Sequence, residues 1–423
     1  MSDYTETLTN IGQVNVKTAE LISSDGKIFD ITLLIGDITI FEDIFSNTMS
    51  GYIILQDSVD LINNVPLLGQ ELFRLELNTP TLEQTITKSF YIYKLHKRII
   101  ENRSQIYKLE FCSQELIYSL NSKISKSFEG NISDTVVSIF KDSRYLASES
   151  KIYIDKTQNE YQFIAPFWSP IETINWLASK SINEDGVPNY LFYETNQSFE
   201  FVSIDTLLKA DPIREYVYSD VDRNTVYGVY GDKDLKYSIV ESVENSVTFD
   251  YMRNVSAGMY SSKLYTYDMT SKSIQTEHYD YIDDFDKTKH LGKFPLRTEN
   301  LARKRLSSLY FIPKNNYRNG VFAKQGYSDF FLQRNSLLEQ ISALKQIIKV
   351  PGRTDIKAGN IIKFTILQIK KNTSEDITSD SAISKYFSGN YLITAIKHKI
   401  INGEHIMYME IVTDSFQEEL GKK

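Results

Sequence analysis

The chain has 423 residues, of which 41% are hydrophobic and 24% are charged, a composition that excludes wholesale disorder and predicts two to four folded domains. Its formal net charge is −8, and its basic clusters are no longer than three residues, as in the run His96-Lys97-Arg98. Tight binding of nucleic acid needs a concentrated basic face, so the charge argues against a nucleic-acid reader.

Neither a membrane segment nor a disulfide is expected. No apolar run approaches the roughly 18 residues that cross a bilayer, and the first ten residues lack a basic segment followed by an apolar stretch, so we expect synthesis in a cytoplasm without a cleaved signal. Cys112 is the only cysteine, which excludes an intrachain disulfide and a cysteine-based zinc cluster. It ends an alternating run and is interpreted as a small buried apolar side chain, not as a nucleophile.

Residues 1–120 predict a first β domain. Short runs with alternating polarity follow one another at a spacing typical of a compact sandwich or barrel, at 14–18, 28–35, 38–41, 51–55, 72–77, 89–95 and 106–112. The connector at 42–50 mixes apolar and polar residues without strand alternation.

Residues 121–225 predict a mixed α/β domain. Asn131, before an apolar run at 135–140, predicts a capped helix. The run Ser169-Pro170-Ile171-Glu172 is a stronger helix start, because the serine can cap the helix, the proline suits its first position and the glutamate completes a capping box. Two aromatic runs predict a hairpin, at 190–193 and 199–202.

The rest of the chain predicts a second β domain that is interrupted by a return of the middle domain. Strand character returns at 226–260 and again at 346–418, and residues 419–423 form a tail. The intervening residues 261–345 combine an acidic, aromatic and irregular stretch, up to about residue 290, with two helices. These helices are expected at 299–309 and at 328–348.

Both β domains end in a strand–turn–strand ladder. The first ladder joins 90–95 to 106–111, and the second joins 391–396 to 405–412 across the turn Asn402-Gly403. The parallel suggests an internal repeat of two similar β domains.

No catalytic motif is present. The sequence holds no glycine-rich phosphate loop, no Gly-x-Ser-x-Gly elbow and no His-Glu-x-x-His. His398 and His405 flank a turn and are interpreted as a cross-strand pair rather than a metal site. The acidic run at 280–286 lacks the glycine and the distal glutamate of a calcium loop and is interpreted as a solvated loop. We therefore predict no catalytic, cofactor-binding or metal-binding residues, and a protein that is not an enzyme.

A series of segments stands in a recognisable order across most of the chain, at 38–41, 51–58, 68–77, 90–95, 107–111, 166–172, 190–194, 199–205, 357–362 and 388–398. Their order and spacing resemble the baseplate hub subunit of T-even-like contractile-tailed phages. More distantly, they resemble the hub part of type VI secretion spike proteins.

The resemblance implies a β-rich α+β fold with two tail-tube-like β-barrel domains and a mixed α/β domain inserted between and around them. Three chains would close a ring of six barrels, a homotrimer that matches a sixfold tail tube on one side and a trimeric central spike on the other. Tail tube proteins and baseplate wedge proteins are the other implied partners. DNA would pass through the lumen without specific binding, which the acidic balance of the chain suits. The implied location is the tail baseplate of a virion, with no membrane insertion and no cofactor.

One interface hypothesis follows from the resemblance. The connector at 42–50 holds the position that in tube proteins makes stacking contacts between rings, and Phe45 and Met49 are its candidate exposed anchors. A simple surface loop is the alternative. A different function class also stays open, a tail-associated glycan-binding or glycan-hydrolysing protein, which could use the aromatic stretch at 260–281.

Overall fold

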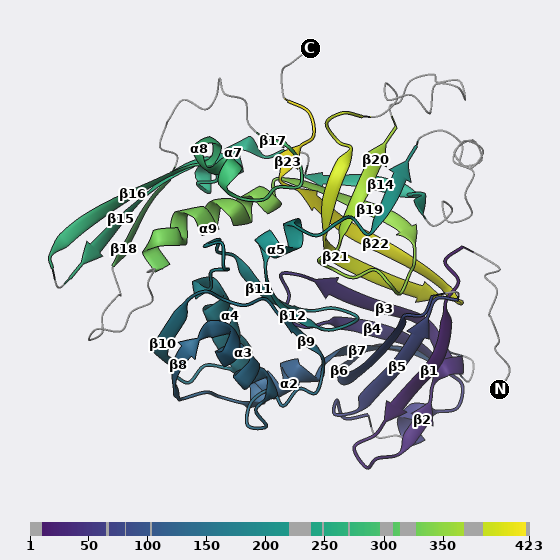
Figure 1. Cartoon of the computed structure of the whole chain (residues 1–423). Helices are drawn as coiled ribbons and strands as arrows, with labels where there is room; N and C mark the ends of the chain where they lie inside the picture. Colours follow the sequence, from purple (N-terminus) through teal and green to yellow (C-terminus); the bar gives the residue numbers. More distant parts are fainter. Residues whose placement is uncertain are drawn as a thin grey trace.

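The computed structural model describes residues 11–64, 67–80, 82–101, 104–219, 238–247, 249–269, 271–296, 308–313, 327–367 and 384–419. Its main feature is a 13-stranded sheet with the order β14-β19-β22-β21-β3-β4-β7-β6-β5-β1-β2, in which β20 also pairs with β21, and β13 with β20 (Figure 1). The strands are β1 (Asn15–Ile22), β2 (Ile28–Asp30), β3 (Ile35–Asp43), β4 (Ser50–Asp57), β5 (Leu72–Asn78), β6 (Thr85–Glu101), β7 (Ser104–Ser113), β13 (Arg214–Tyr218), β14 (Ser242–Val247), β19 (Leu344–Pro351), β20 (Ile361–Ile366), β21 (Gly389–Ile401) and β22 (Glu404–Thr413).

Alternating side chains build the core of the first β half, which comprises β1 to β7. In β4, Ile53 and Leu55 are buried while their neighbours face outward, as the two-residue period of a strand requires. The rings of Phe90 and Phe111 meet in this core, with centroids 4.6 Å apart. Gly51 makes room for Phe111, because a Cβ there would collide with that ring and with the carbonyl oxygen of Thr39. Two short helices, η1 (Thr32–Leu34) and α1 (Leu61–Asn64), complete this half.

The predicted middle domain is mixed α/β, with α2 (Gln114–Asn121), β8 (Ser127–Asn131), α3 (Ile132–Lys141), β9 (Ile152–Ile154), β10 (Glu160–Ile164), α4 (Pro170–Lys180), β11 (Tyr190–Glu194), β12 (Phe199–Ser203) and α5 (Ile204–Leu208). Both predicted helix starts are confirmed. The side chain of Asn131 caps α3 by accepting from Ser133 N–H. In α4, Ser169 Oγ accepts from Glu172 N–H and the Glu172 carboxylate accepts from Ser169 N–H. The predicted hairpin is β11 with β12, and β9 pairs parallel to β12.

The stretch expected to be irregular up to residue 290 is instead ordered, so that prediction is wrong. β15 (Ser261–Asp268) and β16 (Ser273–Asp280) form an antiparallel hairpin, and β18 (Ser308–Pro313) adds a parallel strand. This three-stranded arm projects from the large sheet with α9 (Tyr327–Ile341) alongside (Figure 1). Tyrosines and polar groups occupy both faces, which hides the strand period. The short elements around it are α7 (Tyr251–Ser256), α8 (Tyr281–Asp284), η3 (Phe285–Lys287), β17 (Phe294–Pro295) and β23 (Ser415–Phe416).

The helix expected at 328–348 is correct only in its first part, because α9 ends at Ile341 and β19 begins at Leu344. Leu337, Ile341, Leu344 and Ile348 fit a helical stripe, but residues 344–350 also alternate between buried and half-buried. Residues 344–351 form a strand because they pair with β14 on one side and with β22 on the other. Of the helix expected at 299–309, residues 299–307 lie outside the described part of the chain, and its last two residues begin β18. Residues 226–237 of the expected strand region also lie outside it, as do residues 220–225 of the predicted middle domain.

The two β halves share one strand order. The first half runs β3-β4-β7-β6-β5-β1 and the second, made of β13, β14 and β19 to β22, runs β14-β19-β22-β21-β20-β13. The ladders β6·β7 and β21·β22 have a bulge at the same place, after Ile92 and after Ile393. The N–H groups of these two isoleucines donate to equivalent carbonyls, those of Glu71 and Asn360, each at 2.9 Å. One difference is that β13 runs parallel to β20, whereas β1 runs antiparallel to β5.

The halves are joined by the antiparallel pair β3·β21, which runs from Asp37↔Ile401 to Asp43↔Ala395. This pair makes one continuous sheet of the two halves. Among the described strands the sheet is an open path. In the second half an isolated bridge, Val217↔Ile239, connects β13 to the residues just before β14.

Candidate functional site

An open cavity of about 740 Å³ lies where the first β half meets the predicted middle domain. The first strand residues of β6 form one wall, and α2, the loop before β9 and the β11–β12 turn form the other. Its lining is largely polar and includes Lys88, Gln114, Glu115, Ser150, Glu194 and Gln197.

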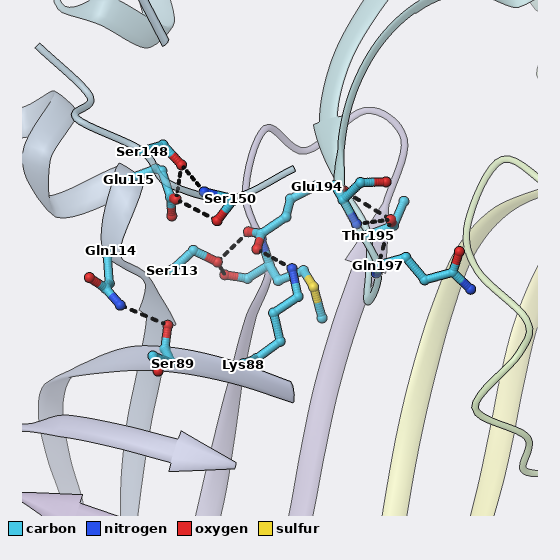
Figure 2. A network of polar contacts seen from close by, with 12 residues as sticks. Lys88, Ser89, Ser113, Gln114, Glu115, Ser148, Ser150, Glu194, Thr195 and Gln197 are labelled. Carbon is cyan, nitrogen blue, oxygen red and sulfur yellow. Dashed lines mark hydrogen bonds and ion pairs between the residues drawn. The ribbon is translucent and has the colours of Figure 1, made fainter. Parts of the chain in front are cut away.

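Glu194 is the central side chain of this junction (Figure 2). Its carboxylate is buried and accepts from Met49 N–H at 2.9 Å, from the Ser113 hydroxyl, and from the Lys88 ammonium at 2.7 Å. A buried carboxylate needs a counter-charge and hydrogen-bond donors to offset its desolvation, and all of them here come from the first β half. Glu194 thus holds the end of β11 against β4, β6 and β7.

A second carboxylate, Glu115 at the start of α2, lines the same cavity. Its Oε1 accepts from the hydroxyls of Ser148 at 2.6 Å and Ser150 at 3.2 Å (Figure 2). Burial, and then the nearby charge of Glu194, raise the pKa of Glu115. Two carboxylates on one cavity are what glycoside hydrolysis uses, but both of these are bound by donors of the surrounding protein. The arrangement is that of a hydrogen-bonded junction.

Cys112 lies close to this junction and is buried. Burial, and then the charge of Glu194, raise the pKa of the thiol to about 11. A thiol with a raised pKa is a poor nucleophile at neutral pH, so the interpretation of Cys112 as a buried apolar side chain is confirmed.

The predicted contact between His398 and His405 is confirmed, and it extends to a third residue. His398 Nδ1 lies 3.0 Å from His405 Nε2, and His398 Nε2 lies 3.0 Å from Glu42 Oε1. The other oxygen of Glu42 accepts from Ala358 N–H at 3.1 Å. All three side chains are buried, and they link β3 of the first half to β21 and β22 of the second. Burial, and then the neighbouring His398, hold the pKa of His405 well below its ordinary value.

A second buried histidine contact fixes the segment between β16 and β18 to the end of β22. His290 Nδ1 lies 2.7 Å from Asp414 Oδ2, and the imidazole stacks on Phe285 with ring centroids 3.8 Å apart. Ser415 Oγ donates to Asp414 rather than to His290, so these three residues do not have the order of a serine-nucleophile triad.

The acidic run at 280–286 is not a free loop, because it begins at the end of β16 and continues through α8 and η3. Asp280 caps α8 by accepting from Ile282 N–H, and Asp284 pairs with Lys287. Within the described ranges, no group of three or more His, Cys, Asp or Glu side chains is placed to hold a metal ion. No helix in the same ranges is both long and apolar enough to span a bilayer.

The two candidate stacking residues lie in different environments. Phe45 is 49% exposed at the connector between β3 and β4, and its N–H donates to Asp43 Oδ1. Met49 is buried in the core of the first half, so the expectation that it is an exposed anchor is wrong. The residue precedes β4 directly, and its side chain follows the inward face of that strand.

Sequence reasoning missed both carboxylates that organise the junctions, Glu42 and Glu194. Each lies in a strand with apolar neighbours, and its partners come from distant parts of the chain. The available signal was a charged residue at a position of strand alternation that should be buried.

Proteins of known structure share this fold. No protein-family model matches the chain, and no curated protein sequence does. Among solved structures, a tail protein from Neisseria meningitidis MC58 matches with a TM-score of 0.56 and 9% identity, over 94% of this chain and 96% of that one. The 43 kDa tail protein of prophage MuSo2 from Shewanella oneidensis gives 0.55 and 8%, over 94% and 98%. Prophage tail protein gp18 from Listeria monocytogenes EGD-e gives 0.51 and 8%, over 94% of each chain.

These matches extend over nearly the whole chain in both directions, so they include the β halves, the segments between them and their order. The predicted resemblance to phage tail proteins is confirmed at the level of the fold. The chain has the fold of phage tail proteins.

Proposed function

We propose that the chain is a structural, non-enzymatic subunit of a phage tail baseplate hub, and that three copies close a ring between a sixfold tail tube and a trimeric central spike. The observation that carries this proposal is the repeated strand order of the two β halves. The shared fold with prophage tail proteins supports the tail as the location.

The repeat explains how three chains could meet sixfold symmetry. Each chain supplies two β units with corresponding strands, so a ring of three presents six similar units and still has a true threefold axis. In this proposal residues 1–120 form one tube-like barrel unit, and residues 226–260 with 346–418 form the other. Residues 121–225 and 261–345 flank the ring and meet spike or wedge proteins.

A lumen for DNA is supported by the charges on the large sheet. On the face turned away from the β cores, four lysines of β7, β19 and β21 are matched by carboxylates, in the pairs Lys108–Glu110, Lys345–Glu410, Lys349–Glu241 and Lys399–Asp37. Paired charges leave little positive potential to hold a polyanion. DNA would pass such a face without being retained.

Light scattering on the purified protein tests the ring. The expected mass is three times the chain mass of 48.9 kDa, either alone or on addition of the trimeric spike. A protein that stays monomeric at micromolar concentration with and without the spike would overturn the proposal.

We also propose that Phe45 contributes to docking of the ring on the tail tube. Replacing Phe45 with Ser is expected to weaken tube docking about tenfold, because removing a large apolar side chain from an interface core costs roughly 1–3 kcal/mol. Cosedimentation with tube rings measures this. Leu33→Ser is the matched control, since Leu33 is also an exposed apolar residue of the first half. Equal docking by the Phe45 variant and the control would contradict the role.

A further inference from the structure

We propose that the ring closes through a strand pair between copies, β6 of one chain with β14 of the next, in the register of the β3·β21 pair inside each chain. This inference rests on the proposed function, because it presupposes that copies of the chain form a ring. It names the two edges that meet and the residues that face each other.

The first step concerns the edges of corresponding strands. Along one edge of β21, residues 389–392 pair with β20 and residues 395–401 pair with β3. Along the same edge of its counterpart β6, residues 85–91 pair with β5. No other described strand pairs with the remaining residues of that edge. The counterpart of β3 is β14, which pairs with β19 alone. The chain therefore makes the β3·β21 junction once. Its counterparts β14 and β6 each keep the corresponding edge unpaired among the described strands.

An exposed strand edge is a template for pairing with another chain. Here the two open edges are the two sides of a junction whose geometry the chain already uses. A contact between different surfaces of identical copies is head-to-tail, and such contacts form a ring when the rotation closes.

The register follows from the ladders. Glu110 and Glu410 hold equivalent places, opposite Lys94 and Ala395. A second bulge, between His96 and Ile99, gives β6 one residue more than β21, so Ile99 corresponds to Lys399 and Ile100 to Ile400. The β3·β4 and β14·β19 ladders match Thr39 with Glu244. Transferring the β3·β21 register across these matches gives the pairs between chains, with the second residue on the neighbouring copy: Ile99 with Glu244, Ile100 with Val243, and Glu101 with Ser242.

Exposure of the equivalent side chains supports the pairing. Ile400, opposite Ile38, is 4% exposed because it packs into the core of the first half. Its counterpart Ile100 is 67% exposed, and Ile99 beside it is 51% exposed. The core of a neighbour's second half, beside Val243, offers Ile100 the environment that Ile400 already has.

The segments that flank the two edges show the same contrast. Ile44, just after β3, is buried, and its N–H donates to the Thr394 carbonyl at 2.9 Å. The segment just after β14 instead exposes Phe249 and Met252, and Tyr93, the counterpart of Thr394, is also exposed. Apolar side chains are thus gathered on both edges that the inference joins.

Charge is complementary across the proposed contact. The free edge of β6 carries the basic run His96-Lys97-Arg98. The facing strand begins after Glu241 and carries the exposed Glu244. Opposite charges at the rim of an interface favour this orientation of two copies over contact between two β6 edges.

The test is a disulfide at the inferred register. In a Cys112→Ala background, Ile99→Cys with Glu244→Cys places one cysteine on each edge. Directly opposed residues of antiparallel strands have Cα atoms about 4.5–5.5 Å apart, within the range that a disulfide bridges. Mild oxidation is expected to convert most of the protein to covalent trimer on a non-reducing gel, reversible by reductant.

Two matched variants serve as controls, one for disulfide formation at this register and one for the register itself. Thr39→Cys with Lys399→Cys makes the same pair inside the chain and is expected to oxidise without a change in mass. Ile99→Cys with Val243→Cys is one residue out of register, which turns one side chain to the other face, and is expected to link poorly. Equal trimer linking by the in-register and out-of-register pairs would overturn the inferred register.

Light scattering on the same samples separates this inference from the proposed function. Trimeric protein that does not link at Ile99 and Glu244 would overturn the strand pair and leave the hub proposal standing. Protein that is monomeric and unlinked, with or without the spike, would overturn both.

Discussion

Replacing Glu194 with alanine is expected to lower the free energy of unfolding by about 3–5 kcal/mol, the usual cost of removing one partner of a buried ion pair. The change leaves the Lys88 ammonium without its counter-charge in a nearly buried position, and leaves Met49 N–H without its acceptor. Chemical denaturation followed by tryptophan fluorescence measures the loss, since Trp168 and Trp176 both lie in the predicted middle domain.

Three variants separate the charge from the hydrogen bonds. Glu194→Gln keeps an acceptor oxygen but removes the charge, so it is expected to lose less than Glu194→Ala. Adding Lys88→Met to Glu194→Gln should recover part of that loss, because no buried ammonium then remains. Asp185→Ala removes an exposed partner of Lys209 and is expected to cost no more than about 1 kcal/mol. A loss for Glu194→Ala as small as that of Asp185→Ala would show that the junction adds little to stability.

The parts of the fold that the sequence predicted are those with strong local signals. The capping box at Ser169 and Glu172 predicts the start of α4 because its hydrogen bonds are made within four residues. In the ladders β6·β7 and β21·β22, the strands β7 and β22 alternate in burial over much of their length, and their partner strands are neighbours in the sequence. Such elements need no information from distant parts of the chain.

The errors have a tertiary cause. Leu344 and Ile348 satisfy a helical period and a strand period equally, and only the strands on both sides decide between them. In the arm, Tyr265 and Tyr267 lie on the outward face while Leu264 faces α9, so neither face is purely apolar or purely polar. A pattern with aromatic residues on both faces carries no clear period.

The junction residues were partly predictable. His398 and His405 flank one turn, so local sequence indicated their contact. Glu42 is 356 positions from His398 along the chain, and Glu194 is 145 from Met49. Contacts over such separations depend on how the two halves and the middle segment assemble. The β3·β21 pair also forms only when the two halves assemble, and its register is the one inferred for the contact between copies.

Acidification below about pH 6.5 is expected to destabilise the chain through His405. The pKa of His405 in the folded chain lies well below its ordinary value, first because of burial and then because of His398. An unfolded histidine takes up a proton at about pH 6.5, so from there downward the unfolded state binds more protons than the folded state. The contribution of His405 to stability is therefore complete above that pH and is lost as the pH falls toward the folded pKa. One extra proton on unfolding gives a slope of at most about 1.4 kcal/mol per pH unit.

Chemical denaturation of the wild type and of His405→Gln between pH 7.5 and 5 measures this contribution. Glutamine keeps a hydrogen-bonding partner for His398 and does not titrate, so the variant is expected to lose less stability than the wild type over this interval. The other ionisable groups are present in both proteins, and their contributions cancel in the difference between the two slopes. Since His405, His398 and Glu42 connect β22 and β21 to β3, the acid-sensitive element lies at the joint between the halves. Identical slopes for the two proteins would mean that His405 is protonated as easily in the folded chain as in the unfolded one, which its full burial argues against.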